Sequence, residues 1–312
     1  MLLDIVFIIV GVALVLWGAD RMTDGAVAIA QRMRIPQIVI GLTIVAMGTS
    51  MPEFFVSLTS ALKGTTDIAV GNVVGSNIFN TLLIVGVAAM VTPMTIMKST
   101  VERDMPWSVV AMLLLAVFSI NHSVSRWEAV FLFVLFVGFV TYTVVSARKN
   151  KTSVKTDEGS KSYSPFMAAC LVVLGLACLI VGSNLFVDAA TRVAQTLGVS
   201  EAVIGLTIVA GGTSLPELAT SVVAARKGQS AIAIGNVIGS NIFNVLMIVG
   251  ITGLVYPMNI QGITIVDLSV FVGSIFLLWA FSYTKYKVER WEGTVLTAIF
   301  LVYMSYLIAN AV

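Results

Sequence analysis

Charged side chains are scarce in this sequence. Asp, Glu, Lys and Arg make up 11% of the 312 residues, whereas hydrophobic residues make up 58% and the mean hydropathy is +1.00. A chain of this length with so little polar material cannot coat the surface of a soluble globular protein. The composition therefore predicts an integral membrane protein, and no basic stripe of the kind that binds nucleic acid is present.

Cysteine and histidine are nearly absent. The two cysteines, Cys170 and Cys178, lie about two helical turns apart in one apolar segment, where they cannot form a disulfide with each other. The single histidine, His122, excludes a histidine-based metal site. His122 lies in a predicted loop, so without a histidine or paired aspartates in the predicted helices an intramembrane hydrolase lacks its nucleophile and base. We therefore expect a protein that is not an enzyme and needs no cofactor.

Long apolar runs recur along the whole chain, and none alternates like a barrel strand. The expected fold is all-α, with ten transmembrane helices. They are placed near residues 3–31, 36–62, 67–92, 104–121, 127–147, 166–196, 201–225, 230–256, 263–283 and 292–311. The first run lacks a basic start and a small-residue cleavage site, so it is predicted to be a spanning helix and not a signal peptide.

The chain contains an internal repeat with an offset of 164 positions. Residues 41–80 return as residues 205–244 with 26 of 40 positions identical, and the offset also relates Gly18 to Gly182. We therefore predict two homologous halves, 1–147 and 166–312, joined by a polar linker at 148–165. Because each half has five predicted helices, an odd number, the second half enters the membrane in the inverted orientation, as in many transporters.

Basic residues are distributed unevenly between the predicted loops. Only Lys63 and Arg126 fall on one side. The loops of the other side contain Arg32, Arg34, Lys98, Arg103, Arg148, Lys149, Lys151, Lys155, Lys161, Arg226, Lys227, Lys285, Lys287 and Arg290. By the positive-inside rule, the linker is predicted to be cytoplasmic and both termini are predicted to lie outside.

Each repeat contains one glutamate in an apolar segment. An ionised carboxylate inside the membrane costs roughly 3 to more than 10 kcal/mol, and no Lys or Arg lies near Glu53 or Glu217 in its predicted helix. A bound cation or a proton must therefore compensate the charge. Hydroxyl groups precede both glutamates by four and three positions, on the same helical face: Thr49 and Ser50 in one repeat, Thr213 and Ser214 in the other.

Further oxygen donors follow from the same motifs. Pro52 and Pro216 have no N–H, so each frees a carbonyl one turn earlier in its helix. The next predicted helix of each half adds Ser76 and Asn80, or Ser240 and Asn244, four residues apart. A set of carboxylate, hydroxyl, amide and carbonyl oxygens suits Ca²⁺ and Na⁺, and suits Mg²⁺ less well. The negative charges of two glutamates balance one Ca²⁺, and two or three Na⁺ in the same oxygen shell would compensate them similarly.

The motifs GTSMPE with GNVVGSNIFN, and GTSLPE with GNVIGSNIFN, resemble the two alpha-repeats of the sodium/calcium exchanger family in the cation/calcium exchanger superfamily. The resemblance covers nearly the whole chain and is to the compact prokaryotic members. It implies a secondary antiporter that exchanges Na⁺ for Ca²⁺ across the plasma (inner) membrane of a prokaryote, by alternating access to a shared site near the membrane midplane. It also implies that the first and sixth helices slide to switch access.

The resemblance also assigns roles to residues. Thr49, Thr213 and the two glutamates would bind Ca²⁺. Sodium would use Ser50, Ser76, Ser214, Ser240 and the carbonyls of Ala46 and Ala210, with Asn80 and Asn244 beside the centre. Potassium-dependent members carry aspartate at the position of Asn244, so no potassium dependence is expected.

Two other functions compete with this hypothesis. The glutamates could carry protons, which would make a Ca²⁺/H⁺ antiporter, although the hydroxyls of Ser76 and Ser240 favour sodium. A cation channel is the less favoured alternative. The lipid bilayer and the two cations are the only partners that the sequence predicts.

Overall fold

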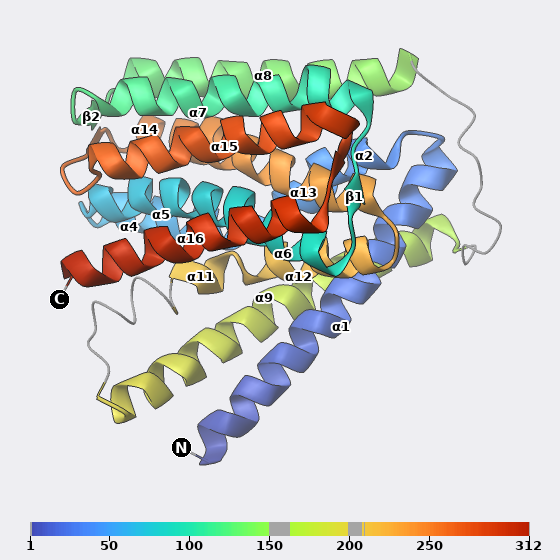
Figure 1. Cartoon of the computed structure of the whole chain (residues 1–312), viewed down its shortest axis with the longest axis horizontal. Helices are drawn as coiled ribbons and strands as arrows, with labels where there is room; N and C mark the ends of the chain where they lie inside the picture. The colour runs from blue at the N-terminus through green and yellow to red at the C-terminus, as the bar shows by residue number, and fades with distance from the viewer. Residues whose placement is uncertain (1, 150–162, 199–207, 209, 312) are drawn as a thin grey trace.

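The computed structural model describes residues 2–149, 163–198, 208 and 210–311 (Figure 1). The first half contains α1 (Leu2–Met33), α2 (Gln37–Ile40), α3 (Ala46–Thr49), α4 (Met51–Leu62), α5 (Thr66–Ile78), α6 (Val85–Val91), α7 (Met105–Ser119) and α8 (Arg126–Lys149). The second contains α9 (Pro165–Thr196), α11 (Ala210–Thr213), α12 (Leu215–Arg226), α13 (Ser230–Ile242), α14 (Gly250–Val255), α15 (Ile265–Lys285) and α16 (Arg290–Ala311).

Several helices are interrupted at the repeat motifs. The predicted helix 36–62 bends by 46° between Gln37–Thr49 and Met51–Leu62. The break lies at Ser50, directly before Pro52, and Ser214 stands in the same place between α11 and α12. Proline fits the first turn of the new helix because it has no N–H to satisfy there.

Wider π-helical turns were not predicted from the sequence. One of them, Gly41–Val45, precedes α3. Two others, Phe79–Ile84 and Phe243–Val249, follow α5 and α13 at equivalent places in the two halves. Such turns often occur at functional sites, and these two contain Asn80 and Asn244.

Helices α1 and α9 lie side by side and extend away from the rest of the bundle (Figure 1). Glycines every seven residues allow the close contact. A Cβ atom at Gly18 would lie 2.7 Å from the carbonyl oxygen of Gly175, and one at Gly11 would lie 2.8 Å from that of Gly182. The small residues therefore bring the two backbones together, as is common for helices packed in membranes.

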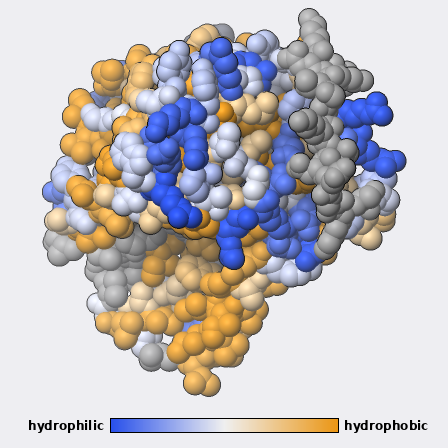
Figure 2. Space-filling view, turned by 45° about the vertical axis from the view of Figure 1, so that its right-hand side comes forward, coloured by the Kyte–Doolittle hydropathy of each residue, from blue (hydrophilic) through white to orange (hydrophobic). Residues whose placement is uncertain are grey.

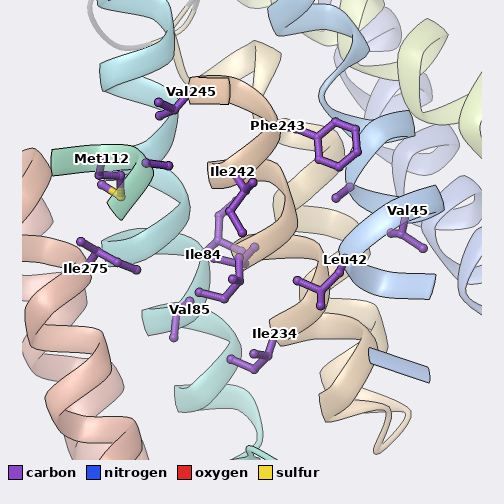
Figure 3. Close-up of a cluster of buried hydrophobic side chains, with 14 of the residues drawn as sticks. Leu42, Val45, Ile84, Val85, Met112, Ile234, Ile242, Phe243, Val245 and Ile275 are labelled. Atoms are coloured by element: carbon purple, nitrogen blue, oxygen red, sulfur yellow. The ribbon is translucent and has the colours of Figure 1, made fainter. Parts of the chain in front are cut away.

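The core joins the two halves of the chain. Figure 3 shows Leu42 and Ile84 of the first half beside Ile234 and Ile242 of the second, all at most 2% exposed. Two short antiparallel sheets also connect the halves, which the all-α prediction did not include: β1 (Met94–Thr95) pairs with β4 (Lys287–Val288), and β2 (Ser123–Val124) pairs with β3 (Met258–Asn259). Each pairing joins one half to the other.

The outer surface is apolar where the helices are long. Figure 2 shows a mostly hydrophobic surface on the part of the molecule where α1 and α9 protrude. Exposed residues along these two helices include Leu2, Ile9, Phe166 and Val173. Seven described helices are long and apolar enough to cross a membrane, or eight if the pair bent at Ser50 forms one span. The count of ten spans stays a prediction. Most of the 148–165 linker, and residues 201–207 and 209 of the predicted helix 201–225, lie outside the described residues.

Candidate cation-binding site

Glu53 and Glu217 lie in the first turns of α4 and α12, immediately after the two helix breaks. Both side chains are 0% exposed. The described residues contain no cluster of three or more His, Cys, Asp or Glu side chains that could hold a metal ion. Any cation at this site would therefore be bound by two carboxylates together with neutral oxygens, a donor set that suits Ca²⁺ or Na⁺.

The serines of the two helix breaks are bonded across the halves. Ser50 Oγ donates to Glu217 Oε1 at 3.1 Å, and Ser214 Oγ donates to Glu53 Oε1 at 2.9 Å. Each serine precedes one glutamate in the chain and binds the other glutamate in space. The two helix breaks therefore lie together, and each half contributes one carboxylate and one hydroxyl donor to the candidate site.

Asparagines of α5 and α13 hold the backbone of the glutamates. Asn72 Nδ2 donates to the carbonyl oxygen of Glu53 at 3.1 Å, and Asn236 Nδ2 donates to that of Glu217 at 3.3 Å. Each amide also donates to a serine one turn after the glutamate, Ser57 at 3.0 Å and Ser221 at 2.9 Å.

Sequence reasoning did not single out Asn72 and Asn236. The signal was available, because each lies four residues before the serine already selected in its repeat, on the same helical face.

Six buried oxygens of the predicted site have no hydrogen-bond donor among the described residues. They are Glu53 Oε2, Glu217 Oε2, Ser76 Oγ, Ser240 Oγ, Asn80 Oδ1 and Asn244 Oδ1. Buried polar atoms in proteins are nearly always satisfied, and each one that is not costs about 1–3 kcal/mol. These oxygens form three symmetry-related pairs, which is the pattern expected of ligands directed at a cation.

A second layer of amides connects the two halves beside these oxygens. Asn80 Nδ2 donates to Asn241 Oδ1 at 3.2 Å, and Asn244 Nδ2 donates to Asn77 Oδ1 at 3.0 Å. All four side chains are at most 1% exposed. Sequence reasoning missed Asn77 and Asn241, which follow the selected serines directly in both motifs. Their role depends on the opposite half, which helical periodicity does not specify.

The remaining predicted residues differ in their surroundings. Thr49 is buried, and its hydroxyl lies 3.0 Å from Asn236 Oδ1. The carbonyl oxygen of Ala46 already accepts the N–H of Ser50 at 3.0 Å. Ala210 begins α11, and Thr213 ends it.

A cavity of about 330 Å³ reaches this region between α4, α9 and α11. Its lining includes Pro52, Thr213 and Asp188, so it extends from the turn that carries Glu53 to a charged residue of α9. Thr213 is adjacent to Ser214 in the chain, and Pro52 is adjacent to Glu53. The cavity therefore reaches residues adjacent in the chain to Glu53 and Ser214.

Comparisons with known proteins show the family of this chain. The family description "sodium/calcium exchanger protein" matches residues 3–145 and 167–309. The chain is 35% identical over 317 residues to the inner membrane protein YrbG of Escherichia coli (strain K12). This match covers 98% of the chain and 97% of YrbG. It is 32% identical over 344 residues to the sodium/calcium exchanger MaX1 of Methanosarcina acetivorans. This match covers 96% of the chain and 97% of MaX1.

A solved structure is also similar over nearly the full length. The sodium-calcium exchanger NCX_Mj, soaked with Na⁺ and Ca²⁺, matches with a TM-score of 0.86 and 30% identity, over 98% of each chain. Together with the seven long apolar helices, these relatives identify an all-α, multi-pass membrane protein. The chain belongs to the sodium/calcium exchanger family.

Proposed function

We propose that this protein is a secondary antiporter that exchanges Na⁺ for Ca²⁺ at the site around Glu53 and Glu217. The observation that carries the proposal is the set of six buried oxygens without a donor among the described residues, in three pairs related by the repeat. Two carboxylates balance the charge of one Ca²⁺, and the flanking hydroxyl and amide oxygens offer further places for Na⁺. Competition of the two ions for one set of ligands is the basis of exchange.

The proposed ligands follow the predicted roles. Ca²⁺ is bound by Glu53, Glu217, Thr49 and Thr213. Sodium uses the four serines Ser50, Ser76, Ser214 and Ser240 and the carbonyl oxygens of Ala46 and Ala210, with Asn80 and Asn244 beside the centre. The crossed bonds from Ser50 and Ser214 support this assignment, because they leave one oxygen of each carboxylate for an ion.

The proposed architecture has ten spans in two inverted halves, 1–147 and 166–312. The exchange of strand partners between the halves and the crossed serine bonds support a pseudo-two-fold relation. The protein is placed in the inner membrane of a prokaryote, with both termini outside and the 148–165 linker cytoplasmic. In this orientation Asp188 lies toward the outside, so the cavity beside it gives the site access from that side.

The test is transport by the purified protein in sodium-loaded vesicles with external ⁴⁵Ca²⁺. Calcium uptake should require internal sodium, should be absent in choline-loaded vesicles and should disappear in Glu53→Gln. Uptake driven by a pH gradient alone would instead identify a Ca²⁺/H⁺ antiporter. Calcium flux that needs no counter-ion would contradict exchange and indicate a channel.

A further inference from the structure

A chain of hydrogen bonds leads from a proposed site residue to a backbone carbonyl of the other half. Asn244 Nδ2 donates to Asn77 Oδ1 at 3.0 Å, and Asn77 Nδ2 donates to the backbone oxygen of Asn241 at 3.2 Å. Asn77, Asn241 and Asn244 are all 0% exposed. The bonds of this chain are therefore shielded from bulk solvent.

The final acceptor determines the orientation of both amides. A backbone carbonyl can only accept hydrogen bonds, so Asn77 must turn its NH₂ group toward Asn241. The oxygen of Asn77 then points to Asn244 and can only accept, which turns the NH₂ group of Asn244 toward Asn77. The Asn244 oxygen lies at the other edge of its amide, where no donor among the described residues satisfies it.

The equivalent chain of hydrogen bonds, which starts at Asn80, ends at a different kind of acceptor. Asn80 Nδ2 donates to Asn241 Oδ1 at 3.2 Å, and Asn241 Nδ2 donates to the hydroxyl of Thr81 at 2.8 Å. A hydroxyl can donate as well as accept, so Thr81 would also accommodate a reversed Asn241 amide. The repeat mate of Thr81 is Val245, which offers no such group to Asn77. Of the two proposed site residues Asn80 and Asn244, only Asn244 therefore has an orientation determined by an obligatory acceptor.

We propose that Asn77 is a positioning residue that keeps the amide oxygen of Asn244 available to the transported cation. This inference rests on the proposed function. An amide turned the other way would present N–H groups to the cation, and these repel positive charge. Asparagine has one oxygen where aspartate has two, so its usefulness as a ligand depends on this orientation. Asn77 itself need not contact the ion.

The test is a double-mutant cycle between Asn77→Ala and Asn244→Asp, with the calcium concentration for half-maximal exchange as the readout. In the otherwise unchanged protein, Asn77→Ala should raise this concentration about tenfold, the factor that corresponds to roughly 1.4 kcal/mol. A carboxylate at position 244 presents oxygen at both edges and needs no orienting. One of its oxygens would also take the place of Nδ2 opposite Asn77 Oδ1, where two acceptors repel. In the Asn244→Asp background, Asn77→Ala should therefore leave the calcium concentration unchanged or lower it.

The cycle separates positioning from a structural role. If Asn77→Ala raises the calcium concentration for half-maximal exchange equally in both backgrounds, or has no effect in either, the inference is wrong. Thr81→Val is the matched control in the chain of hydrogen bonds that starts at Asn80. It should change the calcium concentration for half-maximal exchange less, within about threefold. An effect as large as that of Asn77→Ala would contradict the difference between the two chains.

Two further measurements keep the result interpretable. Equilibrium binding of ⁴⁵Ca²⁺ to the detergent-solubilised protein follows the same cycle without transport, and Asn77→Ser replaces Asn77→Ala if the alanine variant does not elute as a monodisperse protein. Wild-type vesicles that show no sodium-dependent uptake would contradict the proposed function. Normal exchange without coupling between positions 77 and 244 would contradict this inference alone.

Discussion

The ammonium nitrogen of Lys227 lies 2.6 Å from Oδ1 of Asp24. The same nitrogen lies 2.7 Å from Oδ1 of Asp20, so the end of α12 is tied to α1 by two ion pairs. The repeat relates Lys227 to Lys63 and Asp24 to Asp188. Lys63 and Asp188 are both exposed, and neither forms an ion pair within the described part of the chain. Of two contacts related by the repeat, this structure makes one.

Lys227→Gln should weaken the attachment of α1 to the core on the predicted cytoplasmic side. The ion pairs are partly exposed, so we expect a loss of about 1 kcal/mol or less, which is at most about a fivefold shift in the access equilibrium. The measurement is the apparent calcium affinity on each side of oriented vesicles, which should rise on the cytoplasmic side and fall outside. Lys63→Gln is the matched control and should not produce this change. Equal shifts on both sides would show that Lys227 does not bias access.

Alternating access through inverted halves predicts that Lys63 and Asp188 approach each other in the opposite state. With Cys170 and Cys178 replaced by alanine, Lys63→Cys with Asp188→Cys should crosslink only under ion gradients that populate that state. The crosslink should stop exchange until a reductant is added. Lys227→Cys with Asp24→Cys should crosslink readily in the state described here. Crosslinking of the first pair that does not depend on the ions would contradict the relation.

The crossed serine bonds lead to a paired prediction. Ser50→Ala and Ser214→Ala each remove one hydrogen bond from a hydroxyl to the carboxylate of the other half. A hydrogen bond to a charged group contributes about 1.5–3 kcal/mol, so each variant should weaken calcium binding by about tenfold or more. Equilibrium ⁴⁵Ca²⁺ binding measures the loss. A loss in one variant only would show that the site is not symmetric.

The sequence selected the residues of the proposed site but did not predict their partners. Helical spacing places Ser50 on the same face as Glu53, because both belong to one segment. It does not show that Ser50 binds Glu217, since that contact depends on how two helices from different halves face each other. For the same reason, Asn77 and Asn241 were missed, although both motifs contain them.

Backbone irregularities were only partly predictable. Pro52 and Pro216 predicted a freed carbonyl one turn earlier, because proline cannot donate a hydrogen bond within a helix, but the helices 36–62 and 201–225 were predicted to be continuous. The π-helical turns at Phe79–Ile84 and Phe243–Val249 have no comparable residue signal. Both turns consist largely of buried residues, and no local pattern in the sequence marks them.

The contact between α1 and α9 provides a stability prediction. A Cβ atom at Gly18 would lie 2.7 Å from the carbonyl oxygen of Gly175 and 3.0 Å from the Cβ of Cys178, so Gly18→Ala must push the two backbones apart. Gly138 has no atom within 4 Å of such a Cβ, which makes Gly138→Ala a control with the same chemical change. Overpacking of this kind costs about 1–3 kcal/mol. The midpoint of thermal unfolding in detergent should therefore fall for Gly18→Ala and remain near the wild-type value for Gly138→Ala. Equal midpoints for the two variants would show that α1 and α9 can separate at no cost, and that close packing at Gly18 does not hold them together.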